Sequence, residues 1–169
     1  MPEALAIRRA IPGDEFEVAA LHVASWQIGY RGIFDDAFLD QLTPEDRVHR
    51  YSFDQATPRT DLALRGGELV GFVTTGPCRD DDISDAFEIM ALYVDPEHWG
   101  TGIGRTLLHH AHRTMRETGA DLGVLWVLEE NLRAIGLYQS EGWILDGAIR
   151  QEDPWDVVAT VARMQRSLT

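Results

Sequence analysis

The pattern that decides the fold of this chain is the stretch ALYVDPEHWGTGIGRTLL, residues 91–108. An apolar strand-like run leads into a proline turn, and Gly100, Gly102 and Gly104 precede a run with apolar residues at helical spacing. Glycines let a ligand approach the backbone without Cβ clashes, and the first amides of a helix have no intrahelical partner. Together with the helix dipole, this order of strand, loop and helix predicts a binding site for phosphate oxygens.

Two common phosphate-binding patterns do not fit this loop. A Walker A loop ends in Gly-Lys-Ser/Thr, and the chain contains no lysine. A dinucleotide fold needs G-x-G-x-x-G, and counted from Gly102 its third glycine falls at Leu107. Taken alone, the loop also fits a glycine-rich turn that only caps a helix, so the rest of the chain has to decide.

Size and composition predict an ordinary globular protein. The 169 residues (19.0 kDa) suit one compact domain over residues 1–169, and 44% hydrophobic with 25% charged residues are typical values. The N-terminus lacks the basic start and apolar stretch of a secretory signal, so we expect a cytoplasmic protein that does not enter membranes. The single Cys78 cannot form an internal disulfide and is expected to be a small buried hydrophobic residue.

The charge of the chain excludes several classes of function. A formal net charge of −13 opposes binding to nucleic acid or to an anionic membrane surface, and it mildly favours cationic small molecules. The missing lysine excludes Schiff-base and pyridoxal-phosphate chemistry, since both need a lysine amine.

His109 and His112 lie three residues apart on the predicted helix, but we expect them to be solvated surface residues and expect no metal site.

The remaining pattern alternates between strands and helices without repeats or linker-like segments. Asp14 stands at the N-cap position of the first helix, and Gly66–Gly67 join a predicted hairpin. The predicted strands are 3–9, 61–64, 69–75, 86–94, 122–128, 143–150 and 157–166, and the helical segments are 15–28, parts of 30–51, 103–117 and 131–142. This order indicates the α/β (α+β) class, with a mixed sheet and helices on both faces.

Two separate motifs resemble those of the GNAT superfamily of N-acetyltransferases. The glycine loop at residues 99–104 is similar to Q/R-x-x-G-x-G/A, with Trp99 in place of the polar first residue. Residues 131–143, NLRAIGLYQSEGW, resemble N-x-x-A-x-x-F-Y-x-x-x-G-F, with Leu137 and Trp143 at the two apolar positions. The resemblance covers nearly the whole chain. It implies a single mixed, mostly antiparallel twisted sheet, and transfer of an acetyl group from acetyl-CoA to an amine without a metal.

The resemblance also implies which residues bind the cofactor. The pantetheine arm should pair with the strand at Leu92, Tyr93 and Val94, and Asn131 and Tyr138 should contact CoA from the next helix. Because Trp99 lacks the usual polar group, the contacts to the pyrophosphate have to come mainly from the backbone amides, or from Arg105. The loop residues of this expected cofactor site are Trp99, Gly100, Thr101, Gly102, Ile103, Gly104 and Arg105.

Amide formation from a thioester needs a group that takes the excess proton of the amine and a group that protonates the thiolate. Glu88 stands where some members of the family have a catalytic glutamate, and it is the candidate general base, with Asp85 as a weaker substitute. The alternative for Glu88 is a solvated carboxylate at a strand end. Tyr138 is the candidate acid by resemblance, and its alternative is a core residue.

The expected acceptor is a small-molecule or peptide amine. Trp26, Tyr30, Phe34 and Trp155 are the aromatic candidates for binding it by cation–π contact, or they fill the core. One rival function is a non-catalytic acyl-CoA-binding or sensor module on the same fold, and a second is a nucleotide-binding protein, which the glycine spacing disfavours. The apolar segment Val157–Val161 allows a homodimer paired through C-terminal strands, or it is a buried strand.

Overall fold

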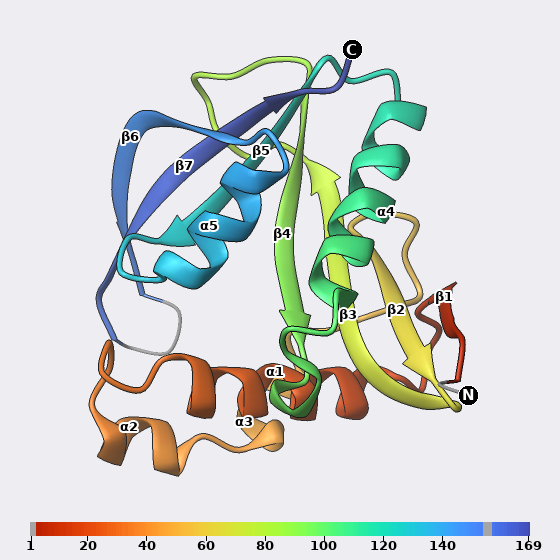
Figure 1. The fold of residues 1–169 in the computed structure, drawn as a ribbon, viewed down its shortest axis with the longest axis vertical. Helices are drawn as coiled ribbons and strands as arrows, with labels where there is room; N and C mark the ends of the chain where they lie inside the picture. Colours follow the sequence, from red (N-terminus) through yellow and green to blue (C-terminus); the bar gives the residue numbers. More distant parts are fainter. Residues whose placement is uncertain (1–2, 154–156) are drawn as a thin grey trace. The chain divides into compact units, whose positions relative to one another are not determined.

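The computed structural model describes residues 3–153 and 157–169 as alternating strands and helices (Figure 1). The helical elements are α1 (Glu15–Gly29), α2 (Asp36–Gln41), α3 (Pro44–Val48), the 3₁₀ turn η1 (Pro96–His98), α4 (Ile103–Glu117) and α5 (Leu132–Ser140). The strands are β1 (Leu5–Arg9), β2 (Arg59–Arg65), β3 (Glu68–Pro77), β4 (Ala86–Val94), β5 (Leu122–Leu128), β6 (Ile144–Glu152) and β7 (Ala159–Ser167).

These strands form a seven-stranded sheet in the order β1-β2-β3-β4-β5-β7-β6. The pairs β1–β2, β2–β3, β5–β7 and β6–β7 are antiparallel, and β4 pairs with β5 in parallel. The parallel ladder covers residues 86–89 of β4 and 122–125 of β5, so β4 continues for five residues beyond its last pair. The prediction of a mixed, mostly antiparallel sheet is therefore confirmed.

The chain divides into two compact units, Met1–Thr75 with Ala91–Ala111, and Gly76–Met90 with His112–Thr169. In the first unit, Val18 and Leu21 of α1 pack with Leu62 of β2 and Phe72 of β3 in one buried cluster. The neighbouring Gly71 faces the other way, because successive residues of a strand point to opposite faces of the sheet. There it meets α4, so helices cover both faces of this unit, as predicted.

Gly71 lets the beginning of α4 pack closely on the sheet. A Cβ atom built at this position would lie 2.9 Å from Leu107 Cδ1, 3.0 Å from the Tyr93 carbonyl oxygen and 3.3 Å from Ile103 Cγ2. Such distances are shorter than ordinary van der Waals contact, so any side chain here would displace the helix or the strand. The glycine thereby fixes where the first turn of α4 lies.

In the second unit, the two faces of β5 have different chemistry. A Cβ atom at Gly123 would lie 3.0 Å from Trp143, with Leu168 and Met115 also within 3.4 Å, so this face is an apolar core. Trp126 is three positions after Gly123. Because side chains alternate along a strand and three is an odd number, Trp126 points to the opposite face. It pairs in register with Arg163 of β7, and this face carries ionic side chains.

Two local predictions need correction. Asp14 precedes α1 but makes no capping hydrogen bond, because its carboxylate accepts from the Arg8 guanidinium (2.7 and 2.9 Å) and from the Ile11 amide (2.9 Å). The Arg8 partner also holds the pKa of Asp14 below its usual value. Cys78 is only partly buried, whereas a buried residue was expected, because it lies in the loop that follows β3.

Among residues 3–153 and 157–169, no helix is both long and apolar enough to cross a bilayer. In the same residues, no group of three or more His, Cys, Asp or Glu side chains is arranged to hold a metal ion.

Candidate functional site

The glycine loop connects β4 to α4 through two sharp changes of backbone direction. Gly100 and Gly102 have φ of 76° and 88°, a region that strains side chains other than glycine, and nothing lies within 4 Å of a Cβ built at either. The space next to both glycines is therefore open to a ligand. Gly104 lies within the first turn of α4.

The first turn of α4 offers donors without a competing negative charge. The first hydrogen bond of the helix runs from the Thr106 amide to the Gly102 carbonyl, at 3.0 Å. The amides of residues 103–105 come before this bond, in the turn whose amides have no partner within the helix. The turn contains no acidic residue, and it carries the exposed Arg105. In a chain with a net charge of −13, this helix end is a local site suited to an anion.

Trp99 has a structural role at the position where the family pattern has a polar residue. Its indole Nε1 donates to the Val94 carbonyl at 2.8 Å and so ties the loop to the end of β4. Thr101 Oγ1 donates to the His98 carbonyl at 2.6 Å and closes the next turn of the chain. These side chains hold the loop conformation, and the backbone amides are left as the main anion donors.

Alternation along β4 directs the backbone of Leu92 and Val94 away from β3. The Asp95 amide donates to the Val70 carbonyl of β3 at 2.9 Å, and backbone groups of successive residues point to opposite edges of a strand. Leu92 and Val94 thus point to the other edge, where an added strand-like ligand could pair. The Val94 carbonyl already accepts from Trp99 and from Ser25 Oγ (3.2 Å), which leaves Leu92 as the better partner.

Tyr93 is placed differently from its neighbours. Its backbone N–H and C=O point toward β3, as those of Asp95 do. Its hydroxyl accepts a hydrogen bond from Trp26 Nε1 at 3.1 Å. The structure therefore places the Tyr93 side chain with the aromatic residues of α1.

Asn131 and Tyr138 lie at the two ends of one face of α5. Asn131 Oδ1 accepts from the Ala134 amide at 3.2 Å, so the predicted N-cap is confirmed, and the side-chain nitrogen of Asn131 is not used in that bond. Tyr138 is 8% exposed, and its ring centroid lies 6.3 Å from that of Trp143. Gly142 follows with φ of 86° and turns the chain out of the helix.

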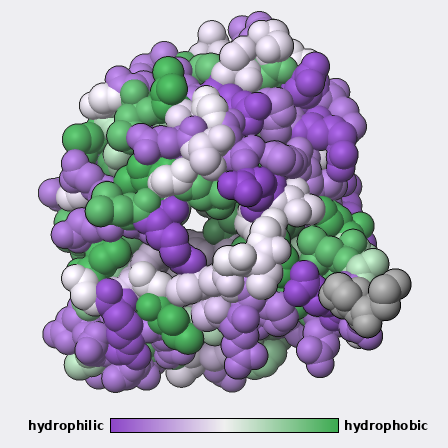
Figure 2. Space-filling view, viewed as in Figure 1, coloured by the Kyte–Doolittle hydropathy of each residue, from purple (hydrophilic) through white to green (hydrophobic). Residues whose placement is uncertain are grey.

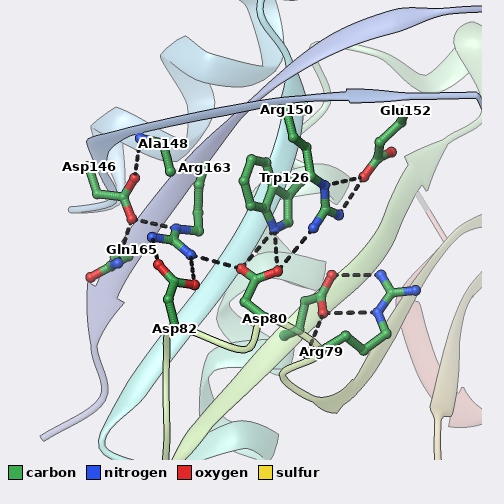
Figure 3. Close-up of polar contacts among 11 residues, drawn as sticks. Arg79, Asp80, Asp82, Trp126, Asp146, Ala148, Arg150, Glu152, Arg163 and Gln165 are labelled. Atoms are coloured by element: carbon green, nitrogen blue, oxygen red, sulfur yellow. Dashed lines mark hydrogen bonds and ion pairs between the residues drawn. The ribbon is translucent and has the colours of Figure 1, made fainter.

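Glu88 is a buried ion-pair partner, and its alternative as a solvated carboxylate is wrong. Its side chain is 2% exposed, and the Arg79 guanidinium binds both of its oxygens, with Nη2 to Oε1 at 2.7 Å and Nε to Oε2 at 3.1 Å (Figure 3). The Arg79 amide adds a third hydrogen bond to Oε2 at 3.3 Å. Pairing with Glu88 raises the pKa of Arg79 above its usual value. Asp85, the weaker candidate, is exposed at the start of β4 with φ of 55°.

Three of the four predicted acceptor residues form one aromatic group in the first unit. The ring of Trp26 stacks on Phe34 at 5.5 Å and meets Tyr30 edge-on at 4.7 Å, and Phe34 also contacts Phe38 at 6.1 Å. Trp26 and Tyr30 are buried, whereas Phe34 and Phe38 are partly exposed at the side of the group. Trp155 lies outside the described residues.

Next to this group, His22 is buried among aromatic rings. It stacks on Tyr93 at 4.4 Å, and its Nδ1 lies 2.5 Å from the hydroxyl of Tyr51. Burial, together with the charges of Arg47 and Arg50, lowers the pKa of His22 well below its ordinary value. His22 is therefore neutral in the folded protein near neutral pH.

Sequence reasoning missed the residues around Glu88. Arg79 lies nine residues before its partner, and the Asp80 carboxylate binds residues of β5, β6 and β7 (Figure 3). The run Arg79-Asp80-Asp81-Asp82 was the only local signal, and a charge run by itself looks like a solvated loop. The contacts of Asp80 depend on which strands are neighbours in the sheet, and a short sequence motif does not indicate that order.

Comparison with known proteins identifies the family of this chain and agrees with its fold. The sequence profile of the Acetyltransferase (GNAT) family matches residues 22–143. A probable N-acetyltransferase of Mycobacterium tuberculosis is 33% identical over 150 residues, which cover 86% of this chain and 83% of that protein. A mycothiol acetyltransferase of Thermobispora bispora is 32% identical over 89% of this chain, which spans only 51% of the length of that enzyme.

Among solved structures, the PaiA N-acetyltransferase of Thermoplasma acidophilum in complex with coenzyme A has the same fold, with a TM-score of 0.67 and 21% identity over 97% of this chain and 99% of that one. The family profile covers more than half of the chain, and it includes both the glycine loop and the α5 motif. The chain therefore belongs to the acetyltransferase (GNAT) family.

Proposed function

We propose that this protein transfers an acetyl group from acetyl-CoA to a primary amine by direct attack in a ternary complex. The observation that carries the proposal is the beginning of α4, where open glycines, helix amides without acidic neighbours and Arg105 make a site for the pyrophosphate of CoA. The edge of β4 at Leu92 is the partner for the pantetheine arm, as an added strand would be. Bound acetyl-CoA supplies a thioester carbonyl as the electrophile.

The transfer needs two proton movements, and two side chains of the second unit have suitable chemistry for them. The amine nitrogen bonds to the carbonyl carbon, the C–S bond breaks, and the products are an amide and a thiol. Glu88 accepts the proton that the nitrogen loses, and the Tyr138 hydroxyl donates a proton to the leaving sulfur. Asn131 contributes its side-chain nitrogen as a donor to the cofactor.

Glu88 keeps the capacity for this role although Arg79 binds it. An ionised carboxylate has about four acceptor positions, and three are used: two on Oε2 and one on Oε1. The remaining position lies on Oε1, which is thus the atom proposed to take the proton. A carboxylate is a sufficient base because attack on the carbonyl makes the amine proton more acidic.

The acceptor is proposed to bind beside the aromatic group of Trp26, Tyr30 and Phe34. The partly exposed ring of Phe34 can contact the apolar part of an acceptor, and the acidic character of the chain favours a cationic amine. A small molecule or a peptide N-terminus fits this description equally.

A homodimer is proposed to form along β6. The segment predicted for this role, Val157–Val161, leads into β7, which lies inside the sheet between β5 and β6. Strand β6 is at the end of the strand order and exposes Ile144 (65%), Leu145 (46%) and Ile149 (58%). Figure 2 shows hydrophobic surface on the side where β6 and α5 are drawn in Figure 1. An apolar edge strand is a ready template for pairing with a second copy.

The experiment that tests the function follows the acetylated product. The purified protein is incubated with acetyl-CoA and a panel of amines, and product mass and free CoA thiol are measured together, with correction for the one cysteine of the chain. We expect equal amounts of acetylated amine and thiol from at least one amine. Tight acetyl-CoA binding without product from any amine class would support the alternative, a non-catalytic acyl-CoA sensor on the same fold.

A further inference from the structure

The loop between β3 and β4 is fastened to the sheet by one buried carboxylate. The side chain of Asp80 is 5% exposed and lies between two arginines and an indole (Figure 3). It accepts from Arg150 Nη1 at 3.0 Å, from Arg163 Nη1 at 3.1 Å and from Trp126 Nε1 at 3.0 Å. These donors come from β6, β7 and β5, so a single side chain connects the loop to three strands.

The two arginines that bind Asp80 are themselves held in place. Arg163 binds Asp82 of the same loop with two hydrogen bonds, at 2.7 and 2.8 Å, and Asp146 at 2.6 Å, and these carboxylates raise its pKa. Arg150 lies over the ring of Trp126, 3.9 Å from its centroid, and also pairs with Glu152. The position of Asp80 is thereby fixed by groups that cannot move independently.

Arg79 directly precedes Asp80 in this loop, and both its backbone and its side chain bind Glu88. The main-chain amide donates to Oε2, and the guanidinium spans both oxygens. The amide contact depends only on where the loop backbone lies. A loop that moved would change this hydrogen bond and the angle of the guanidinium at the same time, and with them the direction of the remaining acceptor position on Oε1.

We propose that Asp80 is a positioning residue of the acetyl transfer: it fastens the β3–β4 loop to the sheet so that Arg79 holds Glu88 Oε1 in the orientation that accepts the amine proton. The inference rests on the proposed function and adds to it a residue that does not contact the substrate. Asp80 acts through Arg79, and Arg79 acts through Glu88.

A stabilising role alone does not account for this arrangement. Burying a charged group is expensive, and buried ion pairs are on average no better for stability than apolar residues of the same volume. What a bidentate, multiply bonded network does provide is a fixed geometry. General-base catalysis depends on such geometry, because the base must lie within hydrogen-bond reach of the proton that it takes.

The test compares Asp80→Asn with Asp81→Asn. Asp81 is exposed in the same loop, so its substitution makes the same change of charge outside the network. For Asp80→Asn we expect kcat to fall about tenfold, a smaller loss than the roughly 100-fold expected on removing the base itself, with KM for the amine and the Kd of acetyl-CoA changed less than about twofold. Asp81→Asn should leave all three values as in the wild type. A lower Tm for Asp80→Asn with unchanged kcat would overturn the proposal.

A double variant shows whether Asp80 works through Glu88. Glu88→Gln alone should lower kcat about 100-fold. If Asp80 acts only by positioning Glu88, adding Asp80→Asn to Glu88→Gln should lower kcat no further, because coupled residues are not additive. An equal tenfold loss in both backgrounds would overturn the proposal.

Cys78 gives a readout that does not depend on activity. It is the only cysteine and lies two residues before Asp80, and its amide donates to the Ala86 carbonyl at 3.0 Å across the loop. Burial, together with the charges of Asp80 and Glu88, raises the pKa of this thiol, so the rates are compared at a pH high enough to ionise it fully, where the charge of Asp80 no longer sets the amount of thiolate. Under that condition we expect Asp80→Asn, but not Asp81→Asn, to be alkylated several times faster than the wild type. Equal rates in all three would overturn the anchoring. A wild-type protein without acetyl transfer would instead contradict the proposed function.

Discussion

The indole Nε1 of Trp99 donates to the carbonyl of Val94 at 2.8 Å, across the turn that leads from β4 into the glycine loop. The side chain that departs from the family pattern therefore fastens the loop to the strand end. Preorganisation of the loop takes the place of a polar contact to the ligand, because the amides of the loop are held where an anion would meet them.

Replacing Trp99 with Phe removes this donor and keeps an aromatic ring. We expect the free energy of unfolding to fall by about 1 kcal/mol, the usual value of a hydrogen bond, and acetyl-CoA to bind several times more weakly. Calorimetry and chemical denaturation measure the two effects. Unchanged affinity and stability together would show that the indole does not hold the loop.

A matched pair of substitutions at Gly102 separates charge from backbone strain. Asn and Asp have the same shape and tolerate positive φ better than most residues, so both variants carry a similar conformational cost at φ of 88°. Only Asp places a negative charge at the phosphate site. We expect Gly102→Asp to bind acetyl-CoA at least tenfold more weakly than Gly102→Asn in calorimetry. Equal affinities would mean that the pyrophosphate lies elsewhere.

Gly71 and Gly136 should respond to alanine in opposite ways. Gly71→Ala pushes a Cβ against the Tyr93 carbonyl and the first turns of α4, so we expect a loss of about 1–3 kcal/mol and weaker acetyl-CoA binding. Gly136 is exposed inside α5 with nothing within 4 Å of its Cβ position, so Gly136→Ala should stabilise by about 0.5–1 kcal/mol. Denaturant unfolding measures both. If Gly71→Ala left the free energy of unfolding unchanged, the close packing of α4 on Gly71 would be contradicted.

Tyr138→Phe removes one hydroxyl and keeps the ring against Trp143. If the hydroxyl protonates the leaving thiolate, kcat falls and the Kd of acetyl-CoA stays nearly the same. Steady-state kinetics with calorimetry gives both values. A variant with wild-type kcat and a lower Tm would assign Tyr138 to packing alone.

The buried His22 predicts how stability depends on pH. Its pKa is lowered in the folded state by burial and by Arg47 and Arg50, so the unfolded chain binds more protons once the pH falls below about 6.5. Stability is therefore lost as the pH falls from about 6.5, with a slope of up to about 1.4 kcal/mol per pH unit. Urea unfolding at several pH values should show a smaller slope for His22→Gln. The same slope in both proteins would rule out His22 as its source.

The sequence was sufficient to predict the parts of the fold that depend on local patterns. Strand 86–94, helix 103–117 and strand 122–128 match the structure residue for residue, because glycines, caps and apolar periodicity define their ends. Asn131 caps α5 as predicted, since N-capping is decided within four residues. Asp14 does not cap α1 in the same way, because Arg8, six residues away, binds its carboxylate.

The surroundings of the site could not be predicted in the same way. Trp26, Tyr30 and Phe34 follow the spacing of helix and turn, and the structure brings their rings together, while their role in binding the acceptor stays a prediction. Glu88 was identified as a candidate, but its burial under Arg79 depends on the path of the β3–β4 loop. The contacts of Asp80 with Trp126, Arg150 and Arg163 span 46 to 83 residues, a separation that only the complete sheet brings together.

Calorimetric titration of acetyl-CoA into the wild-type protein, with Gly102→Asp in parallel, tests the central claim most directly. The account predicts saturable binding at one site per chain in the wild type and a strong loss of affinity in the variant, because the charge would occupy the phosphate site at the start of α4. No binding to the wild-type protein, or equal binding to both proteins, would contradict the assignment of the glycine loop as the cofactor site.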